Sequence, residues 1–308
     1  MEILDLREAL EVDKKSSGLV FINEQPQVRS GRKNDFMVGR FYQNGQSIEF
    51  KIWEERTYEI VVTKGTGIYQ VDVMGSEFNG AYLTVRRIQP YEGDDVTATD
   101  FLSRVPDETF NKTLEEAQRA IRNCGASDTC FQLIKELTHA PELNGRFWLE
   151  AAAIRHHDNV VRGLAFHSFK MLRILAAVLE DNAYLRKNVD LLAVGILIHD
   201  VGKVFEYDMI QISDTWFANH RIRGIEFLAK YKDRIEELYD ERFYRQLQAI
   251  IAGHHGSHGD RPTTLAATVI HYIDTLESQV QGLTEDFMDL SGEENKIYDR
   301  EWGFLEGF

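Results

Sequence analysis

The chain contains the stretch GILIHDVGK, from Gly195 to Lys203, at the end of an apolar run that begins at Leu191. An apolar run of this kind predicts a buried helix. His199 and Asp200 stand side by side at its end, and a histidine and a carboxylate in apolar surroundings need a compensating partner, because an unpaired buried charge is costly. A divalent metal ion is the usual partner, so the stretch predicts a metal site at the end of a buried helix.

Further histidines and an aspartate stand beside apolar sequence in the same, helical half of the chain. They are His167 on the apolar face of one predicted helix, His220 at the start of another, the pair His254 and His255 before Gly256, and Asp274 inside a last apolar helix. Imidazole and carboxylate together suit Mn, Fe, Co, Ni or Zn. Two histidines and two aspartates can hold one ion, and the remaining histidines can hold a second if one carboxylate bridges.

The segment from Gly18 to about Gln89 has a strand-like pattern. Five or six short apolar or alternating runs are separated by turn signals, among them Asn44-Gly45 and Asn79-Gly80, which are typical of hairpins. This pattern predicts a small β-barrel, and the oligonucleotide-binding (OB) barrel is a common form that binds single strands. Stacking and phosphate contacts need aromatic and cationic side chains. We expect these to be Phe41, Lys51, Trp53, Tyr69 and Arg86, with the barrel core as the alternative place for each aromatic ring.

The composition limits the classes of function. The formal net charge is −15 and the pI is about 5.1, which argues against a broad nucleic-acid-binding surface. Residues 15–92 carry ten basic and nine acidic side chains, however, so the strand-rich segment is close to neutral. No apolar run reaches the roughly 18 residues that span a bilayer, and the first 15 residues lack a signal-peptide pattern. We therefore expect a cytoplasmic protein with no membrane partner.

The order of the metal-site residues resembles the HD superfamily of metal-dependent phosphohydrolases. A wider set resembles the YhaM-type 3′→5′ exoribonuclease family. This set comprises His156-His157, Gly163-Leu164 before His167, His199 to Lys203, His220 with Gly224, His254-His255-Gly256, and Tyr272-Ile273-Asp274. That family joins an N-terminal OB-type barrel to an HD domain, so the resemblance covers about Gly18 to Val280. It implies a multidomain α and β protein, with a small OB-like barrel followed by an all-α HD-type domain.

The expected domain boundaries follow from this resemblance and from composition. We expect the barrel in residues 1–92, a helical linker in 93–145 and the HD domain in 146–283. Residues 284–308 form an acidic tail rich in aromatic residues, which either docks on the protein or binds a partner.

The resemblance also implies an activity and roles for particular residues. The activity is metal-dependent 3′→5′ hydrolysis of single-stranded RNA, with single-stranded DNA as a further candidate substrate. Mn²⁺ is the expected ion, in one or two positions, with Fe, Co, Ni and Zn as alternatives. The first position takes His167, His199, Asp200 and Asp274, and the second takes His220, His254 and His255, with Asp200 as the bridge. Lys203 contacts the scissile phosphate or protonates the leaving oxygen, and His156 and His157 bind substrate or lie on the surface.

Two other functions stay open at this point. One is an HD-type nucleotide phosphohydrolase or cyclic-dinucleotide phosphodiesterase with a regulatory barrel. The other is a non-catalytic single-strand-binding protein with a structural metal, although such a protein does not need Lys203. Exposure of Trp53, Phe41 and Arg86 on one face would favour a polymer, and their burial would favour a small substrate. A homo-oligomer is also left open.

Overall fold

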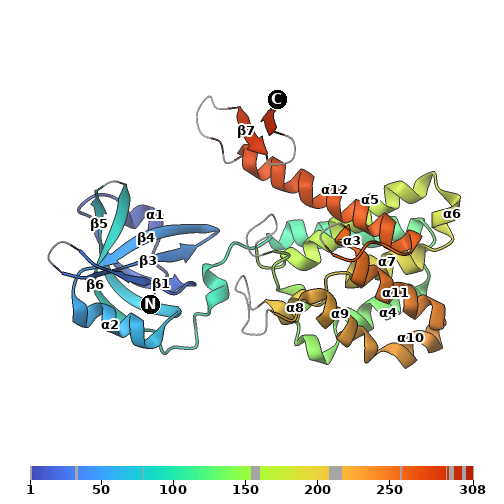
Figure 1. Ribbon diagram of the computed structural model, residues 1–308, viewed down its shortest axis with the longest axis horizontal. Helices are drawn as coiled ribbons and strands as arrows, with labels where there is room; N and C mark the ends of the chain where they lie inside the picture. Colours follow the sequence, from blue (N-terminus) through green and yellow to red (C-terminus); the bar gives the residue numbers. More distant parts are fainter. Residues whose placement is uncertain are drawn as a thin grey trace. The chain divides into compact units, whose positions relative to one another are not determined.

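The computed structural model describes residues 2–31, 34–78, 80–153, 160–207, 217–256, 259–288, 290, 295–299 and 303–307. The chain divides into two compact units, Met1–Arg104 and Val105–Phe308, and Figure 1 labels their elements. Within the described residues, no helix combines the length and the apolar character that crossing a membrane requires.

The first unit is a closed β-barrel. Its elements are α1 (Leu6–Ala9), β1 (Lys15–Ile22), β2 (Gln27–Arg29), β3 (Phe36–Gln43), β4 (Gln46–Ile52), α2 (Glu55–Lys64), β5 (Gly67–Glu77), β6 (Ala81–Pro90) and the 3₁₀ turn η1 (Ala98–Phe101). The strand order is β1-β5-β6-β4-β3, and a pairing of β1 with β3 closes the barrel, while β2 adds to β3. β4 and β6 are parallel, and α2 connects β4 to β5. This is the order of an OB barrel, so the expected fold of this half is confirmed.

Local sequence explains the tight turns and the filling of the barrel. Asn44 and Gly45 both take positive φ angles, 50° and 77°, which a two-residue hairpin requires at both central positions. Inside, the rings of Phe41 and Phe50 stack with their centroids 4.2 Å apart. Tyr69 is also fully buried, and its hydroxyl donates a hydrogen bond to the Gly65 carbonyl at 2.7 Å. Large aromatic side chains therefore fill the interior of this small barrel.

The described part of the second unit is helical, apart from one hairpin near its end. Its helices are α3 (Asp107–Asn123), α4 (Asp128–Thr138), η2 (Pro141–Leu143), η3 (Arg146–Trp148), α5 (Gly163–Glu180), α6 (Ala183–Arg186), α7 (Val189–Ile198), α8 (Lys203–Glu206), α9 (His220–Ala229), α10 (Lys232–Leu238), α11 (Glu241–Gly253) and α12 (Leu265–Met288). The strands β7 (Lys296–Asp299) and β8 (Gly303–Glu306) pair as an antiparallel hairpin. The all-α architecture expected before the tail is thus confirmed.

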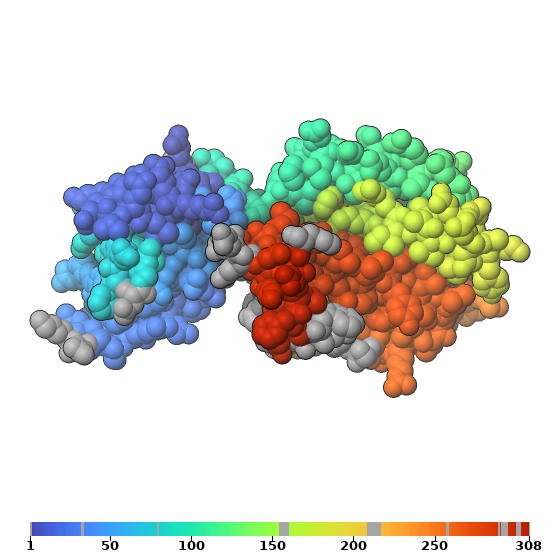
Figure 2. All heavy atoms as spheres, turned by 90° about the horizontal axis from the view of Figure 1, so that it is seen from above, coloured from blue at the N-terminus to red at the C-terminus, as the bar shows by residue number. Residues whose placement is uncertain are grey.

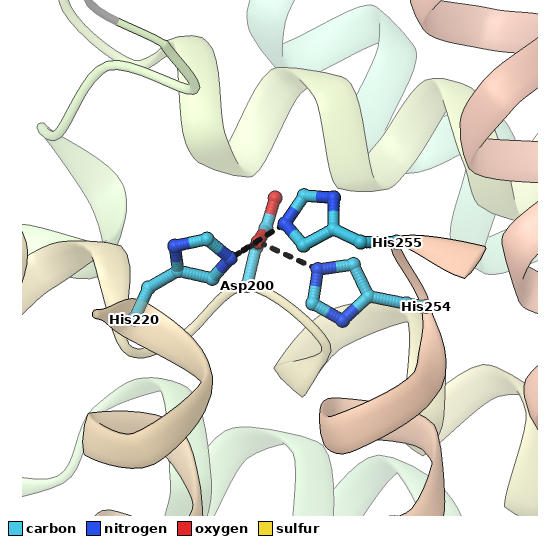
Figure 3. A group of neighbouring side chains, drawn as sticks. All are labelled: Asp200, His220, His254 and His255. Carbon is cyan, nitrogen blue, oxygen red and sulfur yellow. Dashed lines mark hydrogen bonds and ion pairs between the residues drawn. The ribbon is translucent and has the colours of Figure 1, made fainter. Parts of the chain in front are cut away.

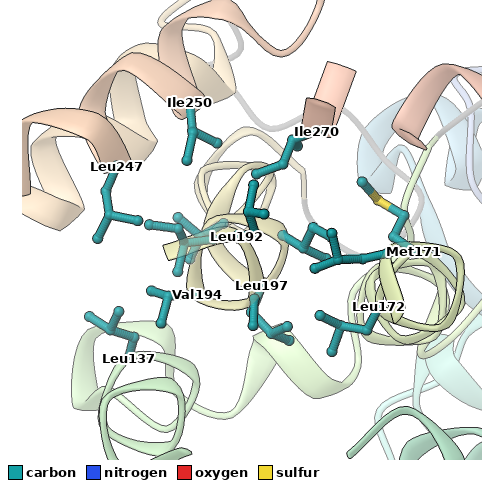
Figure 4. Packing of buried hydrophobic residues seen from close by; sticks show 14 of the residues in the cluster. Leu137, Met171, Leu172, Leu192, Val194, Leu197, Leu247, Ile250 and Ile270 are labelled. Atoms are coloured by element: carbon teal, nitrogen blue, oxygen red, sulfur yellow. The ribbon is translucent and has the colours of Figure 1, made fainter. Parts of the chain in front are cut away.

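Helix α7 lies at the centre of this unit. From Leu191 to Ile198 every side chain is buried, and α4, α5, α11 and α12 all pack against it. Figure 4 shows Leu192, Val194 and Leu197 surrounded by side chains of these four helices. At Gly195 a Cβ would lie 2.7 Å from Ile250 and 2.8 Å from Ile270. The glycine therefore lets α11 and α12 approach α7 closely, one turn before His199.

Residues 105–145, expected as part of a linker, pack in the same hydrophobic core as α7. Phe110, Ile121, Leu133 and Leu137 are all buried in it, and Figure 2 shows this segment, in green, lying directly on the segment that follows it, in yellow. α3 and α4 are amphipathic, so burying their apolar faces favours packing on α5 and α7 over a free-standing linker. The division between the units falls after Arg104, later than residue 92, and α12 runs through the expected boundary at residue 283.

Candidate metal centre

The seven residues expected to hold metal ions lie together, in two adjoining groups. The ligand atoms of His167, His199 and Asp274 are all within 4.8 Å of one another, and so are those of Asp200, His220, His254 and His255. Figure 3 shows the second group, with Asp200 among the three imidazole rings. Helices α5, α9 and α12 and the C-terminal ends of α7 and α11 carry these side chains.

Asp200 faces both groups with a different oxygen to each. Its Oδ2 lies 3.3 Å from Nε2 of His199, whereas its Oδ1 lies 3.2 Å from Nε2 of His254 and 3.6 Å from Nε2 of His220. The other carboxylate, Asp274, has its Oδ1 3.2 Å from Nε2 of His167. Asp200 therefore lies where a bridging carboxylate would lie.

Four of the histidines have their Nδ1 atom held by an acceptor. In His199 and His254 this acceptor is a backbone carbonyl three residues earlier, that of Ile196 at 2.7 Å and of Ile251 at 2.9 Å. A carbonyl only accepts, so Nδ1 carries the hydrogen, and in the neutral ring the free lone pair is on Nε2. The helix ends that carry these histidines thus set the tautomer that a metal ligand needs.

His167 and His220 are held by carboxylates that the sequence analysis did not single out. Nδ1 of His167 lies 2.5 Å from Oε2 of Glu277, and Nδ1 of His220 lies 2.6 Å from Oε2 of Glu206. The spacing gave a usable signal for Glu277, because it stands three positions after Asp274 and residues at this spacing lie on the same helix face. Glu206 follows Lys203 at the same spacing.

The electrostatics favour ionised carboxylates beside histidines. Burial raises the pKa of Asp200, but the nearby charge of Lys203 and the neighbouring His199 outweigh it and hold that pKa well below its ordinary value. Burial likewise raises the pKa of Asp274, yet the hydrogen bond with His167 and the neighbouring His199 bring it below the ordinary value. Burial and the neighbouring His254 lower the pKa of His255 to about 3, so its ring is neutral.

Three buried polar atoms of the two groups make no hydrogen bond among the described residues: Nε2 of His199, Nε2 of His254 and Oδ1 of Asp200. A buried polar atom without a partner costs about 1–3 kcal/mol, so three at one place call for a common explanation. Nitrogen and oxygen donors converging on one spot fit a divalent ion of the Mn, Fe, Co, Ni or Zn type. The residues present therefore fit a metal centre.

Lys203, the last residue of the GILIHDVGK stretch, contacts Asp200. Nζ of Lys203 donates to Oδ2 of Asp200 and to the Ala152 carbonyl, both at 2.6 Å. Burial lowers the pKa of Lys203, but the charge of Asp200 raises it more, and the net shift is upward. A mostly buried ammonium group therefore lies beside the Asp200 carboxylate. His156 and His157, expected near the substrate, lie outside the described residues.

The barrel residues expected to bind nucleic acid divide into two sets. Phe41 and Tyr69 are fully buried, so their rings belong to the barrel core and are not available to stack on bases; this corrects their assignment. Trp53 is 50% exposed and stacks on Phe36 with the ring centroids 4.7 Å apart. Arg86 is exposed beside a bulge that interrupts the pairing of β5 with β6.

Lys51 occupies an intermediate position on the outer surface of the barrel. Its Nζ lies 3.1 Å from the Glu49 carboxylate and 3.8 Å from the centre of the Tyr82 ring. The exposure of Trp53, Phe41 and Arg86 is expected to distinguish a polymer substrate from a small one. Trp53 and Arg86 are exposed to solvent, and Phe41 is buried.

Comparison with known proteins agrees with this architecture. Residues 164–279 match the HD domain family. The 3′-5′ exoribonuclease YhaM of Listeria welshimeri is 27% identical over 76% of this chain and 75% of its own length, and that of Bacillus subtilis is 26% identical over the same shares.

A dihydroneopterin 2′,3′-cyclic phosphate phosphodiesterase of Methanocaldococcus jannaschii is 30% identical over 42% of this chain and 51% of its own length. No solved structure gives a significant match. The matches to the exoribonucleases cover three quarters of both chains, and an OB barrel precedes the HD domain here. The chain is therefore similar to the YhaM-type exoribonucleases over about three quarters of its length, and its helical unit matches the HD domain family.

Proposed function

We propose that this protein is a metal-dependent 3′→5′ exonuclease that hydrolyses the phosphodiester bonds of single-stranded RNA. The observation that carries the proposal is the pair of adjoining His/Asp groups, with Asp200 facing both groups and Lys203 beside it. A structural metal site does not need an ammonium group beside its carboxylate, whereas an ammonium group at this place can contact a phosphate. An RNA substrate also favours the cytoplasm as the protein's location.

In this proposal Asp200 would be shared by two ions. His167, His199 and Asp274 would hold one of them, and His220, His254 and His255 would hold the other. The two oxygens of Asp200 that face different groups support this division. Mn²⁺ is the ion we favour among those that mixed imidazole and carboxylate donors suit. When bound, such ions acidify water and neutralise the charge that develops on a phosphoryl group.

Lys203 supplies a positive charge and a proton from the protein's own side chains. Its raised pKa keeps it protonated at neutral pH, and it stands 2.6 Å from Asp200. From there it contributes positive charge toward a scissile phosphate and can transfer a proton to the leaving 3′ oxygen. Asp200 holds the ammonium group in place, so the loss of either residue should disable the site.

The barrel holds the single strand on the outer face of β3 and β4. Residues directly opposite each other in two antiparallel strands lie on the same face of the sheet. Arg29 of β2 lies opposite Phe36 of β3, so β2 adds Arg29 to this surface. Trp53 beside Phe36 offers a stacking platform, and Arg40 and Lys51 supply positive charge nearby. Aromatic rings with interleaved cations are what binding of single strands needs. Glu24, Gln25, Gln27, Arg29, Arg40 and Glu49 also line a hollow of about 190 Å³ on this surface.

A second candidate function is hydrolysis of a small cyclic phosphate. It is favoured by the 30% identity to a 2′,3′-cyclic phosphate phosphodiesterase, which is confined to 42% of the chain. Both candidates use the same metal chemistry and differ in the need for the barrel.

One experiment separates them. Single-stranded RNA labelled at its 5′ end is incubated with the protein and Mn²⁺, with parallel samples containing EDTA, the Asp200→Asn variant, single-stranded DNA, or a 2′,3′-cyclic nucleotide. The exonuclease predicts a ladder that shortens stepwise and disappears with EDTA or with the variant. Intact RNA together with hydrolysed cyclic nucleotide would support the second candidate, and metal-independent cleavage would contradict both.

A further inference from the structure

The histidines of the two groups differ in what holds the far side of the ring. In His199 and His254, Nδ1 is hydrogen-bonded to a backbone carbonyl of the same helix, which no substitution can remove. In His167 and His220, Nδ1 is hydrogen-bonded to the side chains of Glu277 and Glu206, respectively. Each proposed metal position therefore contains one histidine whose orientation depends on a carboxylate that can be replaced.

Glu277 is part of a four-residue arrangement between α5 and α12. His167 and Lys170 lie one turn apart on α5, and Asp274 and Glu277 lie one turn apart on α12, so each pair occupies one face. His167 contacts Asp274 through Nε2 at 3.2 Å and Glu277 through Nδ1 at 2.5 Å. The other oxygen of Glu277 pairs with Nζ of Lys170. Glu277 is buried, so its hydrogen bond to the histidine is shielded from water.

Glu206 has a comparable position at the other group. It is the last residue of α8, and its Oε2 accepts from both the ring Nδ1 and the backbone N–H of His220, at 2.6 and 2.8 Å. One carboxylate oxygen thus fixes the backbone and the side chain of the first residue of α9. In this orientation Nε2 of His220 faces Oδ1 of Asp200 at 3.6 Å.

We propose that Glu277 and Glu206 are positioning residues that set the metal affinity of the two positions separately, Glu277 through His167 and Glu206 through His220. The inference rests on the proposed function. A carboxylate that accepts the hydrogen bond from Nδ1–H fixes the orientation of the imidazole ring. It also makes Nε2 more basic and therefore a stronger metal ligand. Loss of such a partner typically weakens metal binding about 10- to 100-fold. Because each carboxylate touches a different group, each loss should weaken a different binding step.

The test measures binding without turnover. Wild-type protein, Glu277→Gln and Glu206→Gln are titrated with Mn²⁺ by calorimetry and with Co²⁺ by visible absorption. The amide keeps the shape of the carboxylate but loses its charge. We expect one of two binding steps to weaken about 10-fold or more in each variant, with a different Co²⁺ absorption band changed in each. The double variant should show both losses. Glu285→Gln, a matched change on the same helix, should leave both steps unchanged.

A purely structural role for Glu277 is tested with Lys170→Gln. That variant removes the ion pair between α5 and α12 but leaves the bond between Glu277 and His167, so it should lower the melting temperature without weakening metal binding. Equal loss of affinity in Lys170→Gln and Glu277→Gln would overturn the proposal for Glu277. If Glu277→Gln does not fold, Glu206→Gln tests the proposal independently.

Failure of the inference can be told apart from failure of the proposed function. Unchanged affinities and unchanged Co²⁺ spectra in both glutamine variants would overturn the inference while wild-type protein still binds metal and degrades RNA. A wild-type protein that binds neither Mn²⁺ nor Co²⁺ would instead overturn the proposed function, and the inference would fall with it.

Discussion

Gly202 lies where α8 begins against the first turns of α9, and a side chain has no room there. A Cβ at this position would lie 1.8 Å from the His220 carbonyl oxygen and 2.7 Å from the Gly224 backbone nitrogen. Both are backbone atoms, which cannot rotate away. The φ and ψ of Gly202, −65° and −18°, suit any residue, so the predicted effect of Gly202→Ala comes from this contact and not from backbone strain.

The size of the effect follows from the distances. The backbone at His220 must move by at least about 1.2 Å to reach the 3.0 Å below which Cβ contacts are essentially never found. Overpacking of this kind costs about 1–3 kcal/mol, which lowers the melting temperature of a unit of this size by roughly 2–12 °C. Displacing a functional group by about 1 Å can cost about 100-fold in rate, and His220 moves with its backbone. Gly202→Ala should therefore lose both stability and activity.

The assay compares melting temperature, Mn²⁺ affinity and RNA hydrolysis for Gly202→Ala and Gly224→Ala. The Cβ of the control at residue 224 would lie 3.1 Å from Cγ2 of Ile251 and no closer than 3.6 Å to backbone, so a shift of a few tenths of an ångström suffices and its losses should be smaller. A Gly202→Ala protein with the melting temperature and hydrolysis rate of the wild type would refute the reasoning. Loss of stability with full activity would show that His220 does not need its present position.

Three further predictions concern other parts of the molecule. Asp200→Asn should reduce RNA hydrolysis at least about 1,000-fold, while filter binding of RNA by the barrel stays near the wild-type level. Trp53→Ala should weaken RNA binding by about 1–3 kcal/mol, read as the dissociation constant from fluorescence anisotropy, whereas hydrolysis of a small cyclic phosphate should not change.

The third concerns pH and the metal-free protein. Burial lowers the pKa of His167, but its hydrogen bonds to Asp274 and Glu277 outweigh this and raise it from 6.5 to about 10. Its stabilising contribution is thus complete below pH 6.5 and lost toward pH 10, so melting in EDTA should decline over that range and His167→Gln should flatten the decline.

Much of the candidate metal centre could be predicted from local sequence, because each proposed ligand lies in or at the end of a helix with its own apolar pattern. His199 and Asp200 follow a run that is apolar on all sides, and His167 and Asp274 interrupt apolar faces. The helices converge because each buries its apolar face on α7, so the polar interruptions meet as well. Glu206 escaped prediction because its only signal is its closeness to Lys203, and a single glutamate in a short polar segment is normally a solvated residue.

In the barrel, the sequence pattern could not predict which aromatic side chains are buried and which are exposed. Alternation distinguishes the inside of a strand from its outside only when one face is polar. In β3, Phe41 and Tyr42 are adjacent and both buried, whereas Arg40 is exposed, so aromatic character alone could not tell which ring stacks on bases. In the stacked pair, Phe36 is the first residue of β3 and Trp53 directly follows the end of β4, and the register that places Met37 opposite Ile52 brings the two rings together.

The adjacency of His199 and Asp200 has a geometric reason. Consecutive residues on a helix point about 100° apart, so at the end of α7 the first side chain turns toward His167 and Asp274 while the second lies between the two groups. α5, α11 and α12 pack on α7 and carry His167, His254 and Asp274, and α9 is held by α8 and α11. The distances within the centre are therefore fixed by the packing of the core. Gly195 and Gly202 show the consequence, since each marks a close approach that a side chain would prevent.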